Sequence, residues 1–291
     1  AFSCINVDKF YEVFSRCNLC GHNCGIDRTK ENSGFCNSTD EIYISSYNLH
    51  FGEEPPLSGK NGSGTIFFTG CNLNCVFCQN YPISQLRNGR KISQEKLVSI
   101  MLELENKRAH NINFVSPTHY SPIVADAILR ARRRGLKIPI VYNCGGYDSI
   151  EALKLLDGLV DVYMPDSKYG NENGEKYSGA PGYFNINKIA VREMHRQVGD
   201  LKLDASGIAV SGLLVRHLVL PDNLAGSFEV LDFIANELSK KTYVSIMSQY
   251  HPAHRSDEFS ELARRLNERE YMEVVDYARK LGLENAYIQY L

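Results

Sequence analysis

From Gly64 onward the chain alternates short apolar segments, rich in Val, Ile, Phe and Tyr, with segments of helical period. This alternation is typical of a parallel sheet whose two faces are covered by helices. Six segments are predicted to be strands: 64–70, 111–117, 138–144, 160–166, 212–221 and 243–252. A last apolar piece, 286–291, is expected to close or edge the sheet. Six strand–helix units rather than eight favour a partial barrel, with a doubly wound open sheet as the alternative.

Helix boundaries can be predicted at three places. Asp148 and Glu151 form a capping-box pattern at the start of a helix that ends at Gly158. Apolar residues recur at helical spacing in 268–281, before Gly282. The basic run 130–134 is interpreted as the solvated end of a helix rather than as a binding patch.

The first 60 residues do not follow the alternation. The stretch 16–36 is rich in Cys, Gly and Asn and has no sustained apolar period, so a metal or another cross-link is expected to hold it. The Pro- and Gly-rich stretch 51–64 is interpreted as a connector. We therefore predict a Cys-rich N-terminal region at 1–62 and an α/β partial barrel at 63–291.

Composition narrows the class of protein. With 291 residues, 43% of them hydrophobic and 23% charged, the chain can bury one large core. A formal net charge of -2 gives no electrostatic argument for nucleic acid or an acidic membrane as the main partner. No run of 18 apolar residues and no targeting segment is present in this sequence. Nine cysteines are too sparse for a disulfide scaffold, so we expect a cytoplasmic protein that binds metal.

Three of these cysteines, Cys71, Cys75 and Cys78, have C-x3-C-x2-C spacing directly after the first predicted strand. Functional loops of α/β proteins lie at the carboxyl ends of strands. Thiolates select soft metals and iron–sulfur clusters, and a cluster held by three thiolates keeps one iron free for a substrate. The alternatives are a zinc site completed by a remote His, or three unrelated thiols.

With the aromatic Phe77 just before the last cysteine, this motif resembles that of the radical S-adenosylmethionine superfamily. The resemblance implies a [4Fe-4S] cluster whose open iron chelates S-adenosylmethionine and cleaves it reductively to a 5′-deoxyadenosyl radical. Within the superfamily, the chain looks like the branch of pyruvate formate-lyase activating enzyme and its uncharacterised homologues. That branch has a partial barrel of six strands.

The resemblance also implies cofactor contacts at further residues. Phe77 resembles the aromatic residue near the adenine, and Asn80 an Asn that supports the cluster loop. Asp166 and Lys168 resemble a D-x-K motif that positions the cofactor, although they could instead form an exposed ion pair. The remaining counterparts are Arg216, for the methionyl carboxylate, and His251, near the ribose and adenine.

One motif departs from the family. The second strand of the activating enzymes ends in GGE, which receives the amino group of the cofactor, whereas here it ends in SPTHY. Ser116, Thr118 or the backbone are the candidate acceptors in its place.

A second group of cysteines, Cys17, Cys20, Cys24 and Cys36, has C-x2-C-x3-C-x11-C spacing. Four ligands close a coordination sphere, so the group is predicted to hold structural zinc or an auxiliary iron–sulfur cluster. The spacing does not separate the two, and the different position of auxiliary clusters in the activating enzymes favours zinc slightly. His22 could replace one thiol, but a loop histidine facing solvent is preferred.

Two cysteines remain. Cys4 and Cys144 have no evident partner, and Cys144 is expected to be a small buried thiol or to face the pocket.

The resemblance implies an enzyme that cleaves S-adenosylmethionine and abstracts hydrogen from a substrate, which by analogy is a glycine in a protein partner, a peptide or a small metabolite. No side chain beyond the cluster ligands is nominated as catalytic, and an electron donor such as flavodoxin or ferredoxin is the expected partner. A non-catalytic iron–sulfur or zinc scaffold, with four protein ligands at every metal, is one alternative. A radical enzyme that modifies tRNA is the other.

Overall fold

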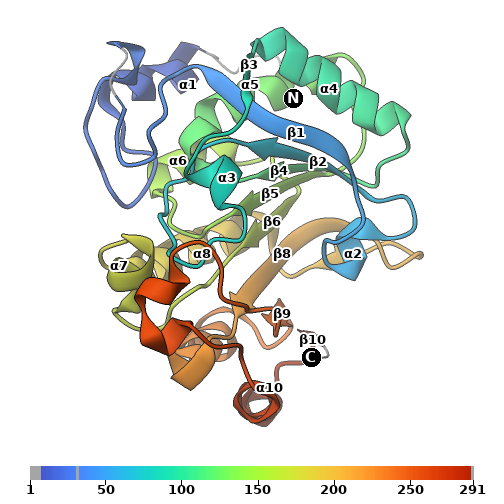
Figure 1. The fold of residues 1–291 in the computed structure, drawn as a ribbon. Helices are drawn as coiled ribbons and strands as arrows, with labels where there is room; N and C mark the ends of the chain where they lie inside the picture. Colours follow the sequence, from blue (N-terminus) through green and yellow to red (C-terminus); the bar gives the residue numbers. More distant parts are fainter. Residues whose placement is uncertain (1–7, 31–32, 290–291) are drawn as a thin grey trace.

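The fold is that of a computed structural model, which describes residues 8–30 and 33–289. Its centre is a curved sheet with the strand order β10-β9-β8-β6-β5-β4-β2-β1-β3 (Figure 1). Cys4 lies outside the described residues.

The predicted parallel sheet is confirmed. Along the order β2-β4-β5-β6-β8-β9-β10, each strand pairs in parallel with the next. β10 forms the edge of the sheet, as expected. The sheet does not close on itself, so the barrel is partial, as predicted. The parallel strands are β2 (Ser63–Phe68), β4 (Ile112–Val115), β5 (Ile140–Cys144), β6 (Val162–Pro165), β8 (Ala209–Leu218), β9 (Tyr243–Met247) and β10 (Ala286–Ile288).

Three further strands were not predicted. β1 (Ile42–His50) runs antiparallel to β2, β3 (Arg90–Ile92) pairs with β1, and β7 (Lys202–Leu203) pairs with β8. β1 escapes a sequence reading because its second half carries polar, partly exposed residues rather than an apolar run. The predicted boundary after residue 62 falls just before β2, and β1 of the N-terminal region belongs to the sheet.

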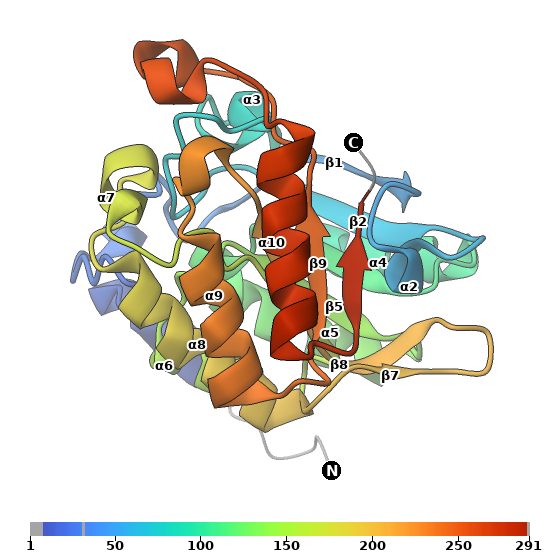
Figure 2. The same ribbon diagram turned by 90° about the horizontal axis from the view of Figure 1, so that it is seen from below.

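Helices lie along the outside of the sheet, and their apolar faces form the main core against its outer surface (Figures 1 and 2). These helices are α4 (Gln94–Asn106), α5 (Ser121–Arg133), α6 (Ile150–Leu156), α8 (Tyr183–Val198), α9 (Ser227–Phe233) and α10 (Glu268–Leu281). Shorter helices are α1 (Asp8–Glu12), α2 (Pro55–Ser58), α3 (Tyr81–Ser84) and α7 (Asn173–Ser178). No helix of residues 8–30 and 33–289 is long and apolar enough to cross a membrane.

The predicted capping box at α6 is wrong, although the helix itself is present. Ser149 is the N-cap residue, and its side chain accepts a hydrogen bond from the Ala152 backbone N–H. Asp148 is buried instead, and its Oδ1 accepts a hydrogen bond from the Tyr142 hydroxyl at 3.0 Å. The predicted end of α10 is confirmed, because Gly282 adopts the left-handed conformation that terminates a helix.

The inside of the barrel is filled unevenly. The predicted connector contains α2, whose Leu57 is fully buried against Val141, Val162 and Met164 on the inner face of the sheet. Helix α2 lies toward the amino ends of the strands. It follows β1, whose last residue pairs with the first residue of β2, and it comes directly before β2 in the chain. The space toward the carboxyl ends remains for polar side chains.

Candidate active site

The loop that carries the three cysteines follows β2 and borders a cavity of about 350 Å³; we call this loop the cluster loop. Cys71, Cys75 and Cys78 all line this cavity, which we call the cluster cavity. The loop is held from outside by backbone hydrogen bonds from Asn74 to Ser178 and from Val76 to Tyr177. Its apolar residues are buried among tyrosines from other segments, so the thiols are fixed by tertiary packing.

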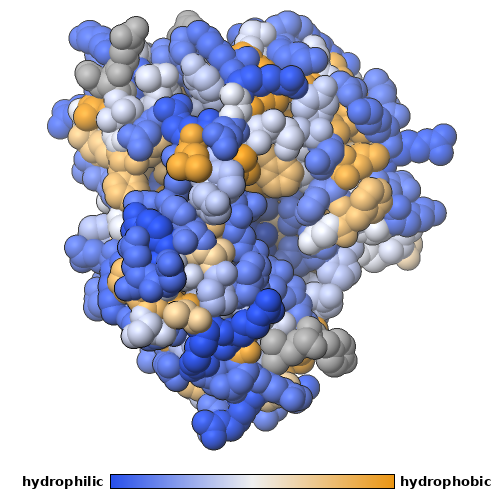
Figure 3. Space-filling model, viewed as in Figure 1, coloured by the Kyte–Doolittle hydropathy of each residue, from blue (hydrophilic) through white to orange (hydrophobic). Residues whose placement is uncertain are grey.

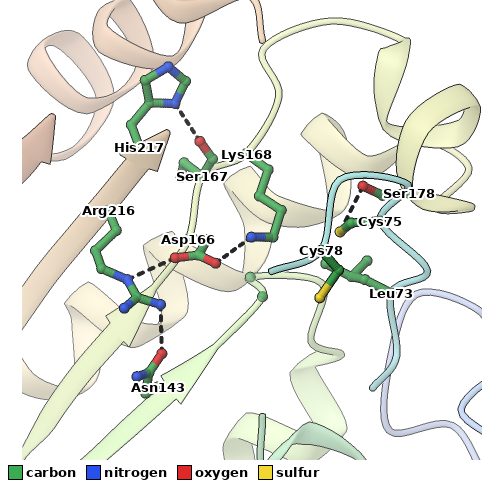
Figure 4. A network of polar contacts seen from close by, with 12 residues as sticks. Leu73, Cys75, Cys78, Asn143, Asp166, Ser167, Lys168, Ser178, Arg216 and His217 are labelled. Atoms are coloured by element: carbon green, nitrogen blue, oxygen red, sulfur yellow. Dashed lines mark hydrogen bonds and ion pairs between the residues drawn. The ribbon is translucent and has the colours of Figure 1, made fainter. Parts of the chain in front are cut away.

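The thiols have the chemistry of ligands to a soft metal. Burial raises the pKa of Cys71 to about 12 and that of Cys75 to about 11. Both are therefore thiols at neutral pH unless a metal centre stabilises the thiolate. Ser178 Oγ donates a hydrogen bond to Cys75 Sγ at 3.0 Å, which also favours the charged form (Figure 4).

The arrangement of the thiols suits an iron–sulfur cluster. Cys71, Cys75 and Cys78 are spread around the wall of one cavity of about 350 Å³. Thiolates are the usual ligands of such clusters, and three of them leave one iron open.

A buried charge network also lines the cluster cavity. Asp166 Oδ2 accepts a hydrogen bond from Lys168 Nζ at 2.5 Å, and Oδ1 accepts one from Arg216 Nε at 2.9 Å. Arg216 Nη2 donates to Asn143 Oδ1 at 2.7 Å, and the close view shows the four side chains pointing toward one another (Figure 4). The side chains of Asp166 and Lys168 are only 13% and 19% exposed, so they do not form the surface pair that the sequence left open.

The network is charged at neutral pH. Burial alone would raise the pKa of Asp166, but Arg216 and Lys168 outweigh it and hold this pKa below its usual value. In the same way, burial opposes the charge of Lys168, yet Asp166 raises its pKa above the ordinary value. Lys168 and Arg216 thus share one carboxylate, and their N–H groups that are not bound to it can donate to an anionic ligand group.

Other predicted cofactor contacts divide into two sets. Asn80 and Ser116 line the cluster cavity. Ser116 directly follows β4 and has a φ of +54°, a conformation that favours glycine, at the position where the family motif has GGE.

Phe77, Thr118 and His251 are not among the residues that line the cavity. Phe77 is buried with its ring edge-on to Tyr250, and Thr118 is buried in a short helical turn. His251 is partly exposed, with Nδ1 3.2 Å from the Nε2 of Gln79 in the cluster loop. Their roles toward the cofactor stay predictions.

The structure also brings residues into the cavity that the sequence did not nominate, chiefly Glu53 and Asn143. Glu53 Oε1 accepts a hydrogen bond from Asn113 Nδ2 at 3.0 Å, and Oε2 lies 3.7 Å from Arg216 Nη1. Burial raises the pKa of Glu53 against the opposing effect of Arg216. Glu53 belongs to the predicted connector, where no pattern distinguishes it. Cys144 also lines the cavity, so this thiol faces the pocket, which is one of the two positions expected for it.

The second cysteine group also converges. Cys17, Cys20, Cys24 and Cys36 line one small cavity together with Arg28 and His119. His22 is not among its lining residues; its ring stacks on Phe35, and Nε2 lies 3.0 Å from the backbone oxygen of Asn72. Since Asn72 follows Cys71, the Cys-rich region supports the cluster loop directly.

Comparison with known proteins identifies the family. The family model of the Radical SAM superfamily matches residues 65–200. This range begins within β2 and ends just after α8. The chain belongs to the radical SAM superfamily. The branch of pyruvate formate-lyase activating enzyme, within it, is not established by this match.

Two archaeal proteins are similar over nearly the whole chain. Uncharacterized protein MJ0674 of Methanocaldococcus jannaschii is 32% identical over 97% of this chain and 80% of its own length. Uncharacterized protein MJ0808 of the same organism is 25% identical over 94% of this chain and 81% of its own length.

A solved structure shares the fold. The FeFe-hydrogenase maturase HydG from Carboxydothermus hydrogenoformans superposes with a TM-score of 0.52 at 14% identity, over 75% of this chain. This chain spans about half the length of that maturase, and the likeness concerns the fold alone.

Membership of the superfamily implies a [4Fe-4S] cluster and S-adenosylmethionine, and it makes the protein an enzyme. The cluster cavity fits these groups on its own evidence. It offers three soft donors, of which burial keeps Cys71 and Cys75 neutral without a metal, and beside them a pair of buried cations that suits a carboxylate.

Proposed function

We propose that this radical SAM enzyme abstracts a hydrogen atom from a protein, peptide or small-molecule substrate, as the activating enzymes of glycyl-radical enzymes do. When bound, the [4Fe-4S] cluster supplies the electron that cleaves S-adenosylmethionine into methionine and a 5′-deoxyadenosyl radical. The observation that carries the proposal is that the three thiols and the Asp166–Lys168–Arg216 network line one cavity.

Each group of this chain has a distinct task in that cavity. Cys71, Cys75 and Cys78 hold the cluster, and Lys168 and Arg216 attract the methionyl carboxylate. Asp166 orients both cations, because each of its oxygens binds one of them. Asn80 and Ser116 add polar contacts at the wall. The abstraction needs no side chain as a base, so none is assigned.

The outer end of the cluster loop suits contact with an electron donor. Cys78 is partly buried, while the next residues, Gln79 and Asn80, are exposed. Electron transfer favours the side of a cluster nearest the surface, so we propose that a flavodoxin or ferredoxin docks there. Such a donor is consistent with a cytoplasmic location.

The experiment is a turnover assay without oxygen. Protein reconstituted with iron and sulfide is incubated with dithionite and S-adenosylmethionine, and 5′-deoxyadenosine is measured. We expect product above a protein-free control, and deuterium transfer into it from a labelled true substrate. Absence of product from cluster-loaded protein would instead support a scaffold, and stimulation by tRNA alone would support an RNA-modifying enzyme.

We also propose that the second cysteine group holds an anionic metal–thiolate centre whose counter-ion is Arg28. Arg28 is 0% exposed, and its guanidinium donates to three backbone oxygens, those of Ser38, His119 and Thr39. It also lies 3.8 Å from Cys17 Sγ and over the ring of Phe14, at 4.6 Å from the ring centroid. No carboxylate within the described chain forms an ion pair with it. A buried cation is costly without an opposite charge, and four thiolates around a metal supply one.

Four thiolates close the coordination sphere of a structural zinc or of an auxiliary iron–sulfur cluster, and the position of the group before the barrel favours zinc slightly. We therefore expect a Cys20→Ala/Cys24→Ala variant to lose one zinc per chain while retaining the iron of the cluster at Cys71, Cys75 and Cys78. Metal analysis of both proteins decides this, and loss of about four iron atoms, the content of a cubane, would establish an auxiliary cluster instead.

A further inference from the structure

A second cavity, of about 490 Å³, adjoins the cluster cavity. The loop between β1 and α2 forms one wall, and β8, β9 and the C-terminal segment around β10 form the other. Because these walls come from the two sides of the open sheet, the cavity occupies the gap where the barrel does not close. Figure 3 shows a hollow near the centre of the face seen in Figure 1. We call this the lateral cavity; it shares Gly52, Glu53, Arg216 and Gln249 with the cluster cavity.

Glu54, on the wall of the lateral cavity, has a buried carboxylate that is unpaired within the part of the chain that the structure describes. The residue is only 6% exposed, and its Oε2 is fully buried with no hydrogen-bond partner among the described residues. No Lys, Arg or His of the described chain lies within ion-pair distance of it. A buried charge without a partner destabilises the fold, so its retention points to a ligand that supplies the missing charge.

The charge balance of the lateral cavity is negative. Glu53 and Glu54 both line it, and Arg216 is the one cation among its described lining residues. Arg216 is already bound to Asp166 and Asn143, and it reaches Glu53 at 3.7 Å. Lys168, in the neighbouring cavity, is paired with Asp166. One carboxylate charge therefore remains for a ligand.

The other walls suit the rest of such a ligand. Met247 and Tyr287 provide apolar and aromatic surface, and Gln249 and Gln289 provide amides. Phe51 at the mouth is a large hydrophobic side chain that is 61% exposed. A carbon chain that ends in a cationic nitrogen group can lie along these walls with its charged end at Glu54.

We propose that the lateral cavity binds the substrate through an ammonium or guanidinium group held by Glu54 and Glu53. The proposal rests on the proposed function, since it takes the lateral cavity as the place from which a substrate meets the cofactor. It narrows the substrate class to cationic amines and guanidines, whether free or in a lysine or arginine side chain.

Binding is tested by isothermal titration calorimetry on the cluster-loaded protein with S-adenosylmethionine present. The probes are pentylamine and pentylguanidine, with pentan-1-ol as the neutral analogue and pentanoate as the anion. We expect a cationic probe to bind at least about tenfold more tightly than the alcohol, as close pairing with a buried charge allows. A Glu54→Gln variant should lose that preference, and Glu284→Gln, at an exposed surface site, should keep it.

A stability readout separates binding from a structural role. If Glu54 is kept for a ligand, Glu54→Gln should leave the midpoint of urea unfolding unchanged or raise it, because an unpartnered buried charge is removed. A lowered midpoint would show a structural role and overturn the proposal. Tyr287→Lys is a second variant, which should place an ammonium group near Glu54 and abolish binding of the amines.

Failure of this inference differs from failure of the proposed function. If wild-type protein binds the alcohol as well as the amines, or if Glu54→Gln keeps the preference, the substrate class is wrong although S-adenosylmethionine is still cleaved. If no 5′-deoxyadenosine forms at all, the proposed function fails, whatever the probes do.

Discussion

Replacing all three thiols of the cluster loop, Cys71→Ala/Cys75→Ala/Cys78→Ala, should reduce the formation of 5′-deoxyadenosine by more than about 100-fold, because loss of even the outer partners of metal ligands costs about 10–100-fold. The three thiols are the soft donors that line the cluster cavity together. The measurement is the rate of product formation with dithionite, alongside iron per chain and the absorbance of the cluster.

Cys144→Ala is the matched cysteine control. Cys144 lines the same cavity and is buried, so a conventional cluster with four protein ligands would recruit it. We expect the variant to retain the iron of the cluster loop and the spectral change on addition of S-adenosylmethionine. Loss of that iron would identify Cys144 as a fourth ligand and would favour the scaffold alternative. Equal product from wild type and the triple variant would contradict the assignment of the loop.

The second large effect is expected from Asp166→Ala. This change leaves Lys168 and Arg216 facing each other without the carboxylate that binds both. Removing one partner of a buried ion pair typically costs about 3–5 kcal/mol. We therefore expect the free energy of unfolding to fall by about that amount, measured by urea unfolding without oxygen on protein carrying its clusters.

Asp166→Asn and Glu41→Ala make the comparison specific. The amide keeps the shape of Asp166 but removes its charge, so most of the loss should remain. Glu41 pairs with Lys91 on the surface, where screening makes an ion pair weak, and its removal should leave the midpoint unchanged within error. A similar effect of Asp166→Ala and Glu41→Ala would show that the buried network does not stabilise the fold.

Most of the fold could be predicted because parallel strands buried on both faces leave a strong local pattern. Each of the six predicted strands is present, and the last apolar piece edges the sheet. β1 could not be predicted in this way, because its polar second half becomes a strand only by pairing with β2. The N-cap of α6 was missed for a related reason. Asp148 has the composition of a cap, but burial beside Tyr142 gives it another partner.

The site was predictable to different degrees. Cys71, Cys75 and Cys78 lie within one loop, so their spacing carries the chemistry. The family resemblance at the ends of the predicted strands gave three cofactor contacts, Asp166, Lys168 and Arg216. The structure brings all three to one cavity. No sequence pattern marked Glu53 and Glu54 as site residues, because an acidic pair before two prolines is an ordinary sequence for a surface turn.

By itself, the sequence determined the parallel α/β fold, the three-thiol loop and the second set of four cysteines, because each is encoded by neighbouring residues. Tertiary structure alone decided which charges are buried and which cavities meet. Asp166 and Arg216 are 50 residues apart in the chain, and the carboxylate of Glu53 reaches Arg216 only where the loop before α2 folds back inside the open barrel. Burial and long-range approach depend on how the strands close around the loop, and no local pattern records them.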